Sequence, residues 1–230
     1  HIPNAIYFDI DKNSDLNSNL PHMLPKKDMW EKIMSSNGIS NNDKIVIYDN
    51  SKVLSSCRLW YMLLYFGHSK KLVSVLNGGL EKWKKNNFPI TEDHTKLKLT
   101  NYKAYENKFM VKNLDEIDNK VFSLVDARSK DRFEGKTKEP REGVRSGSIK
   151  NSICIPFNNV IKDDKTFKDK EELRVIFNNI ISDIDNNNVV FSCGSGITSC
   201  VLALAYSLIN NNYNPTIYDG SWAEYGKIFK

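Results

Sequence analysis

The stretch "NNVVFSCGSGITSCVLALAY", residues 187–206, joins a run of apolar β-formers to an apolar helical pattern through a short turn that contains two glycines. Cys193 stands at this junction, where the backbone N–H groups at the start of a helix converge. A cysteine that only fills a core could equally stand inside the strand or the helix. The position therefore marks Cys193 as a candidate reactive thiol.

The composition indicates a globular chain without a nucleic-acid or membrane partner. The 230 residues are 40% hydrophobic, which is enough for one large domain or two small ones. A net charge of +5, scattered along the chain, is too weak to predict binding to nucleic acid. No apolar run approaches the roughly 18 residues of a membrane span, so we expect a cytoplasmic protein.

The four cysteines predict neither a zinc site nor disulfides. Cys57, Cys154, Cys193 and Cys200 form no CxxC pair, and no clustered histidines complete a zinc site. Disulfides are not expected in a cytosolic chain. We therefore interpret the three cysteines other than Cys193 as core residues and expect neither a metal nor an organic cofactor.

The chain repeats one pattern of strand, polar turn and apolar helix. The stretch "DKIVIYDNSKVLSSCRLWYML", residues 43–63, has the same order as residues 187–206, and aligning the strands places Asp49 opposite Cys193. Strands that alternate with helices predict an α/β fold with mostly parallel sheets flanked by helices. Sites in such sheets form at the carboxyl ends of strands. Only the second repeat has a nucleophile there, so we predict a non-catalytic and a catalytic domain.

Further motifs follow one another along the chain: "HIPNAIYFDID" from residue 1, "VLNGGLEKW" from 75, "LVDARSKDRFEG" from 124, "EPREGVRSGSI" from 139 and "CGSGIT" from 193. Together they resemble the two-domain rhodanese superfamily, and most closely its 3-mercaptopyruvate sulfurtransferase branch. The resemblance implies two tandem rhodanese-like domains. We place the first at residues 1–95, the second at 109–230 and a linker at 96–108.

Two departures from the family pattern concern the domains more than the chemistry. Family members carry an opening strand and helix before the segment that starts here at His1, so the first domain is expected to be truncated at its start. Ser148 replaces a histidine of the second-domain pattern, which we assign to a structural turn.

The loop around Cys193 suits an anionic sulfur. The thiolate is the nucleophilic form of a cysteine, and an ordinary thiol has a pKa of about 8.5. Gly194 and Gly196 are expected to let the backbone N–H groups turn toward the sulfur, and the following helix adds its positive end. We predict that this loop, with Ile197 and Thr198, binds the substrate and stabilises a persulfide.

Two other cysteine chemistries fit less well. Cysteine phosphatases use a Cx5R loop, but the arginine position counted from Cys193 is Ser199. Without that cation the loop would neutralise a phosphate dianion poorly. A cysteine protease would need a histidine base and an oxyanion hole on a different scaffold.

The resemblance implies roles for two arginines. Arg132 and Arg141 match family positions that face the active-site cysteine, and a guanidinium suits the carboxylate and ketone oxygens of a 2-keto acid. Arg128 is expected to anchor the same loop against Asp126 or Glu139.

The resemblance also implies that the first domain contributes to the site. Asp11 and His22 match family positions that align with the loop serine, which predicts a relay through Ser195, His22 and Asp11. Its task would be to move a proton as pyruvate leaves as an enolate. Without the resemblance, a histidine between Pro21 and Met23 is more often a loop residue with no catalytic task.

These features predict a 3-mercaptopyruvate sulfurtransferase. Cys193 would take sulfur from the small-molecule donor as a persulfide and pass it to a thiol acceptor, such as thioredoxin or a small thiol, or to cyanide. Neutral Gly194 and Ser195 favour the keto acid over thiosulfate, for which a CRKGVT-like loop is expected. Thiosulfate sulfurtransferase is the alternative within the fold. A non-catalytic rhodanese-type binding or regulatory module is the alternative from another class.

Overall fold

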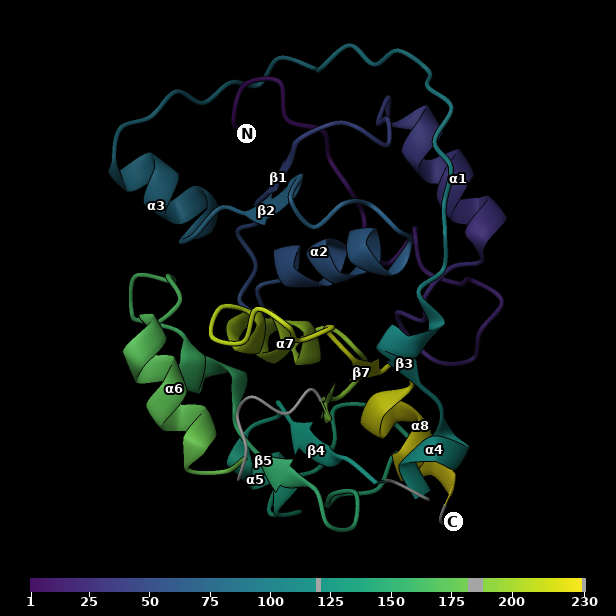
Figure 1. Ribbon diagram of the computed structural model, residues 1–230, viewed down its shortest axis with the longest axis vertical. Helices are drawn as coiled ribbons and strands as arrows, with labels where there is room; N and C mark the ends of the chain where they lie inside the picture. Colours follow the sequence, from purple (N-terminus) through teal and green to yellow (C-terminus); the bar gives the residue numbers. More distant parts are fainter. Residues whose placement is uncertain (119–120, 182–187, 229–230) are drawn as a thin grey trace.

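The computed structural model describes residues 1–118, 121–181 and 188–228, which form two α/β halves (Figure 1). The N-terminal half contains a two-stranded parallel sheet, and the C-terminal half contains a five-stranded parallel sheet. Helices flank both sheets. The predicted fold class is confirmed.

A small sheet organises the first half. Strand β1 pairs in parallel with β2. The elements are α1 (Lys27–Ser36), β1 (Ile45–Ile47), α2 (Ser56–Tyr65), β2 (Val73–Val75) and α3 (Gly79–Lys85). Nearly every residue of α2 is buried, as in a helix enclosed between layers. Arg58 is the one charged residue within this helix.

The second half has a larger sheet with the strand order β3-β7-β6-β4-β5. Its strands are β3 (Val111–Lys112), β4 (Ser123–Asp126), β5 (Ile153–Cys154), β6 (Val189–Ser192) and β7 (Ile217–Tyr218). Its α-helices are α4 (Leu114–Asp118), α5 (Lys130–Phe133), α6 (Lys170–Asn178), α7 (Ser199–Ser207) and α8 (Ser221–Ile228). Two short 3-10 helices, η1 (Lys108–Met110) and η2 (Phe157–Val160), complete the described elements.

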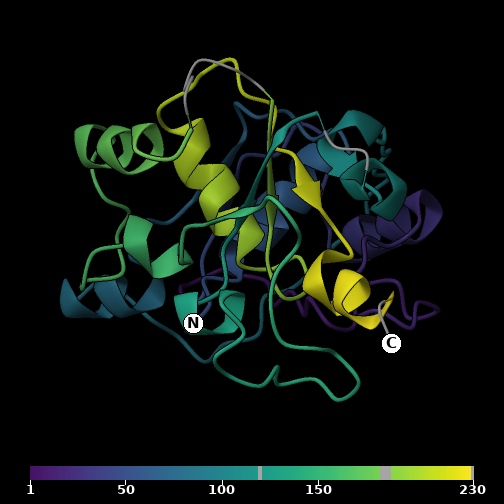
Figure 2. The ribbon, with the colours of Figure 1, turned by 90° about the horizontal axis from the view of Figure 1, so that it is seen from below.

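Successive residues of the central strands face different apolar cores. Val125 and Phe191 belong to the core that includes α6 and α7, whereas Leu124 and Val190 belong to a smaller core with α4 and α8. Figure 2 shows these helix pairs on the two sides of the sheet. A strand covered on both faces needs a continuous apolar run, which explains the Val-Val-Phe sequence of β6.

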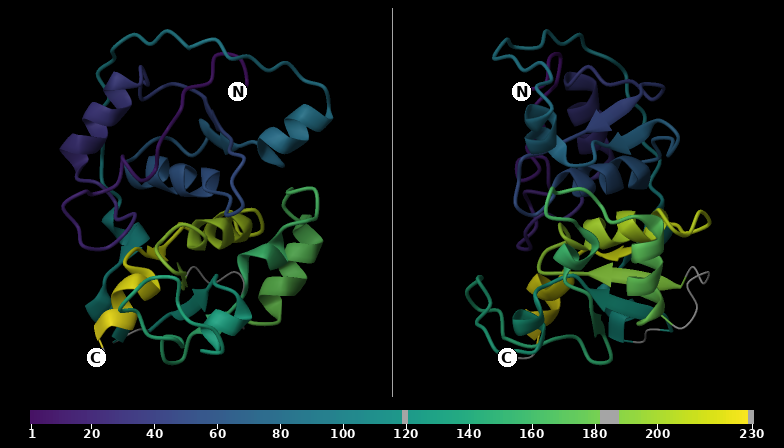
Figure 3. Two further views of the ribbon diagram at one scale, coloured as in Figure 1. Left: turned by 180° about the vertical axis from the view of Figure 1, so that it is seen from behind. Right: turned by 90° about the vertical axis from the view of Figure 1, so that its left-hand side faces the viewer.

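The two halves meet through the equivalent helices of the repeat. Helices α2 and α7 lie side by side between the sheets (Figures 1 and 3). Both are apolar on almost every side, and one hydrophobic core includes residues of both helices. Packing between these helices therefore sets how the first half sits on the second.

Residues 96–108, predicted as a linker, run along the outside of the first half (Figure 1). The Thr100 N–H donates to the Ser35 carbonyl (3.1 Å), and Tyr102 is fully buried. The segment is thus packed against the first half, and the domain boundaries stay a prediction. Every helix within the described ranges is too short or too polar to cross a membrane.

Candidate active site

Cys193 lies directly after β6, at the carboxyl end of a central strand and before α7. The start of α8 holds its backbone. The Cys193 N–H donates to Ser221 Oγ (3.2 Å), and the Trp222 N–H donates to the Cys193 carbonyl (3.0 Å). The junction of strand, turn and helix predicted at residues 187–206 is therefore present from residue 188 onward, and residue 187 lies outside the described residues.

The surroundings of the Cys193 thiol favour its ionised form. Burial opposes ionisation, because Cys193 is 1% exposed. Hydrogen bonds from the Thr198 hydroxyl, from the Ser195 and Ser199 N–H groups and from the Ser199 hydroxyl outweigh burial, so the pKa of Cys193 lies below its ordinary value. Two of the donors are backbone N–H groups, as the sequence predicted, and the other two are the side chains of Thr198 and of Ser199, the first residue of α7.

The pKa values of the other three cysteines shift upward, in the opposite direction to that of Cys193. Cys57 and Cys200 are fully buried and Cys154 is half-buried, and all four cysteines are free. Burial raises the pKa of Cys200 to about 12 and that of Cys154 to about 11. It also raises the pKa of Cys57 well above its ordinary value. Cys193 is thus the cysteine whose environment suits a nucleophile.

The two loop glycines have different tasks. Gly196 has a φ of +78°, in the left-handed region that favours glycine, so its lack of a side chain serves the turn of the backbone. Gly194 lacks a positive φ, and a glycine is needed there because a side chain would have no space. A Cβ at Gly194 would lie 3.0 Å from Arg132 Nη2 and 3.6 Å from Arg141 Nη1. The missing side chain leaves room where both guanidinium groups approach the loop.

A buried carboxylate holds two arginines, one in α5 and one in the segment between β4 and α5. Glu139, with a side chain only 2% exposed, accepts hydrogen bonds from Arg132 Nη2 (2.5 Å) and Arg128 Nη1 (2.9 Å). Arg128 also contacts Asp126 (Nη2 to Oδ2, 2.7 Å). The predicted anchoring of Arg128 is therefore confirmed with both carboxylates. Contact between Glu139 and Arg132 was not predicted.

The first half brings Asp11 and His22 to the loop of the second. His22 Nδ1 lies 2.9 Å from Ser195 Oγ, and His22 Nε2 lies 3.0 Å from Asp11 Oδ1. Arg141 Nη2 donates to the same Ser195 Oγ (2.9 Å). Burial lowers the pKa of His22 despite the nearby Asp11 carboxylate, so the imidazole is neutral near pH 7.

Asp49 occupies the equivalent position in the first half. Its Oδ2 accepts hydrogen bonds from the Ser56 N–H (2.6 Å) and from the Ser51 and Ser55 hydroxyls (both 3.2 Å). The corresponding turn thus already holds an anion, and a carboxylate cannot become a persulfide. The site belongs to the second repeat, with residues added from the first.

Three contributions to the site escaped the sequence predictions. Arg58 and Asp219 form a buried ion pair beneath the loop, and the Ser199 hydroxyl lies 3.7 Å from Cys193 Sγ and helps to lower the pKa of that thiol. The sequence could have indicated Arg58, because a single charged residue inside an apolar helix needs a buried partner. Asp219 follows a strand at the carboxyl edge of the sheet, where site residues gather.

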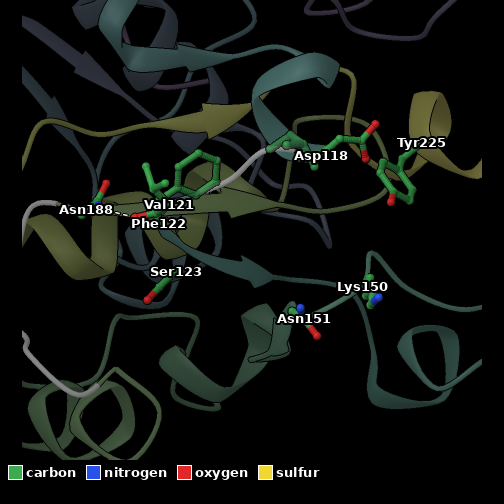
Figure 4. A pocket seen from close by; sticks show the side chains of 9 residues that line it. Asp118, Val121, Phe122, Ser123, Lys150, Asn151, Asn188 and Tyr225 are labelled. Carbon is green, nitrogen blue, oxygen red and sulfur yellow. Dashed lines mark hydrogen bonds between the residues drawn. The ribbon is translucent and has the colours of Figure 1, made fainter.

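A cavity of about 610 Å³ lies away from this site (Figure 4). Ser123 and Asn188 mark the amino ends of β4 and β6, so the cavity is at the opposite end of the sheet from Cys193. The remaining lining residues are Ile117, Asp118, Val121, Phe122, Lys150, Asn151 and Tyr225. We do not assign it to the chemistry of Cys193.

Comparison with known proteins agrees with the fold. The chain belongs to the rhodanese family, because the sequence profile of the Rhodanese-like domain matches residues 1–86 and 110–227.

The relatives are sulfurtransferases. Thiosulfate/3-mercaptopyruvate sulfurtransferase 1, mitochondrial, from Arabidopsis thaliana is 35% identical over 250 residues, covering 98% of this chain and 65% of the plant protein. The 3-mercaptopyruvate sulfurtransferase of Mus musculus is 36% identical over 231 residues, covering 98% of this chain and 76% of the mouse protein. Among solved structures, the 3-mercaptopyruvate sulfotransferase SseA from Escherichia coli has a TM-score of 0.82 and 31% identity, covering 97% of this chain and 84% of that one.

Proposed function

We propose that the protein transfers sulfur from 3-mercaptopyruvate to a thiol acceptor through a persulfide on Cys193. The observation that carries the proposal is the double contact at Ser195 Oγ, which lies 2.9 Å from His22 Nδ1 and 2.9 Å from Arg141 Nη2. A keto acid must lose a carbon fragment that needs a proton, whereas thiosulfate releases sulfite without one. A serine linked to a neutral imidazole suits the keto acid.

The sulfur step begins at the Cys193 thiolate. It attacks the mercapto sulfur of the substrate, so that an S–S bond forms and the C3–S bond breaks. The bonding electron pair leaves with the carbon fragment as pyruvate enolate. Cys193 is thereby oxidised to a persulfide, and C3 is reduced. Arg132 and Arg141 would bind the carboxylate and ketone oxygens and stabilise the enolate charge.

The substrate supplies the proton that the enolate needs. Ser195 takes the mercapto proton while its own hydroxyl proton passes to His22 Nδ1, and the reverse movement delivers a proton to C3. Asp11 accepts from Nε2–H and stabilises the imidazolium that forms briefly. A His22 that is neutral before the reaction is required as the acceptor, in agreement with the pKa lowered by burial.

The acceptor and the location belong to the same proposal. With Cys193 only 1% exposed, the acceptor thiolate must approach the persulfide along the path that admits the donor. A small thiol, or a protein such as thioredoxin that presents a protruding cysteine, would meet this need. Four free cysteines suit a reducing compartment, and the cytoplasm is our proposed location.

The decisive measurement compares pyruvate release from 3-mercaptopyruvate with sulfite release from thiosulfate, each with and without an added thiol. We expect a higher kcat/KM for the keto acid. Cys193→Ser should abolish both reactions, because an alcohol cannot replace the thiolate. Cys200→Ser is the matched control, and it should keep activity.

Two results would redirect the proposal. A preference for thiosulfate would favour the alternative donor, which the printed name of the Arabidopsis relative also includes. Mass spectrometry after brief exposure to either donor should find one added sulfur on Cys193. A chain that forms no persulfide with either donor would instead be a binding or regulatory module.

A further inference from the structure

Arg58 is a fully buried cation that reaches from the first half of the protein into the second. Its Nη1 lies 2.8 Å from Asp219 Oδ1, and the two side chains are 0% and 4% exposed. Burial opposes the charge, but the Asp219 carboxylate together with Cys200 and Tyr61 keeps the pKa of Arg58 above its ordinary value. A buried ion pair is weak evidence for stability, because desolvation offsets its attraction. Its contacts indicate a further role.

The ion pair holds the backbone on both sides of Met23. Arg58 Nη2 donates to the His22 carbonyl (2.5 Å), and the Leu24 N–H donates to Asp219 Oδ2 (2.9 Å). His22 has a φ of 60°, in the left-handed region that side chains rarely adopt. The contacts therefore hold His22 in the unusual conformation from which its imidazole reaches the loop.

The same ion pair contacts the cysteine loop. Arg58 Nη1 donates to the Gly196 carbonyl (3.2 Å), and a Cβ at Gly196 would lie 3.1 Å from Asp219 Oδ1. Gly196 directly follows Ser195 in the chain. Arg58 and Asp219 thus touch the backbone beside both partners of the hydrogen bond between His22 and Ser195.

We propose that Arg58 and Asp219 are positioning residues that fix the distance between His22 Nδ1 and Ser195 Oγ. The inference rests on the proposed function, in which this hydrogen bond moves a proton. According to this inference, the buried ion pair contributes to turnover of the keto acid and not only to folding. Both residues act through His22 and Ser195, so thiosulfate turnover should depend on them little.

A second ion pair between the halves provides a matched control. Lys82 Nζ in α3 lies 2.9 Å from Asp164 Oδ2, with side chains 42% and 48% exposed. In Figure 1, α3 lies at the left of the molecule, and the loop that contains residues 11–24 (purple) lies at the right. This pair therefore connects the same two halves away from the relay.

The test compares the double variant Arg58→Met with Asp219→Asn against the control double variant Lys82→Met with Asp164→Asn. The first change removes both buried charges together, so neither ion is left alone. We expect kcat with 3-mercaptopyruvate to fall roughly 10- to 100-fold while KM stays unchanged, as for a catalytic group displaced by about 1 Å. Thiosulfate turnover should stay within about twofold, and the control variant should resemble wild type with both donors. Equal losses on both donors, or an equal loss in the control, would overturn the inference.

A cycle with His22→Asn separates positioning from general damage. Asparagine tolerates the left-handed conformation but cannot complete the relay. If the ion pair acts through His22, adding its double variant to His22→Asn should cause no further loss with the keto acid. A second loss of the same factor would contradict the inference.

Titration of His22 by NMR tests the inference without turnover. Arg58→Lys keeps the positive charge but replaces the guanidinium fork with one ammonium, which cannot hold the same set of contacts. We expect His22 to become more solvated and its pKa to rise toward the ordinary value. An unchanged His22 pKa would overturn the positioning role and leave the sulfurtransferase proposal standing. A wild-type protein that transfers no sulfur would refute the proposed function, and the titration would still decide the positioning role.

Discussion

Removing the Thr198 hydroxyl should make Cys193 a weaker acid. This hydroxyl is one of the hydrogen-bond donors that lower the pKa of Cys193 against the effect of burial. Valine has nearly the same shape, so Thr198→Val deletes the donor and little else. A hydrogen bond to a charged group contributes about 1.5 to 3 kcal/mol, which corresponds to an about 10- to 100-fold smaller thiolate fraction at a fixed pH below the midpoint.

Alkylation with iodoacetamide, followed by mass spectrometry of the Cys193 peptide, measures this change. A more basic thiolate is also a better nucleophile, so we expect the alkylation rate to fall only about 3- to 10-fold. Ser192→Ala is the control, because the buried Ser192 Oγ has no hydrogen-bond partner among the described residues. Equal rates in Thr198→Val and wild type, or an equal fall in Ser192→Ala, would refute the assignment of Thr198.

Further outcomes are expected at the same site. Gly194→Ala should raise KM for 3-mercaptopyruvate with little change in Tm, because its Cβ would press on Arg132 and not on the core. Arg141→Lys should lower kcat/KM for the keto acid, with a loss of transition-state stabilisation of about 2 to 5 kcal/mol, since an ammonium cannot contact the substrate and Ser195 in the same geometry. Wild-type kinetics would remove Arg141 from the site. His22→Asn should lower kcat with the keto acid about 100-fold. In wild type, kcat with the keto acid should fall as decreasing pH protonates His22. Because the pKa of His22 is lowered, this fall should occur at a lower pH than for an ordinary histidine. A pH profile that His22→Asn leaves unchanged would argue against the relay.

Local patterns in the sequence were sufficient for the fold class and for the position of the nucleophile. The strand β6, the turn after it and α7 follow from a continuous apolar run, a positive-φ glycine and a second apolar run. Contacts between close neighbours were also accessible, as shown by Arg128 with Asp126 two positions away. Such features depend on backbone conformation and on groups that the chain itself keeps near one another.

The two loop glycines show what local patterns could not predict. Gly194 and Gly196 look alike in "CGSGIT", and both were predicted to serve the turn. Only Gly196 has the positive φ, and Gly194 is explained by the arginines that approach it from another segment. The reason depends on a packing contact across more than fifty positions, which no local pattern records.

Tertiary structure alone decided how the two halves cooperate. His22 and Ser195 are 173 positions apart, and a family resemblance suggested their pairing without its geometry. Packing of α2 on α7 brings them together, and it buries Arg58 against Asp219 directly beneath their contact. Residue types and spacing indicate the local conformation and the chemistry that each side chain can perform. The distance between groups on different domains depends on how two apolar helices fit together, which is a property of the folded core.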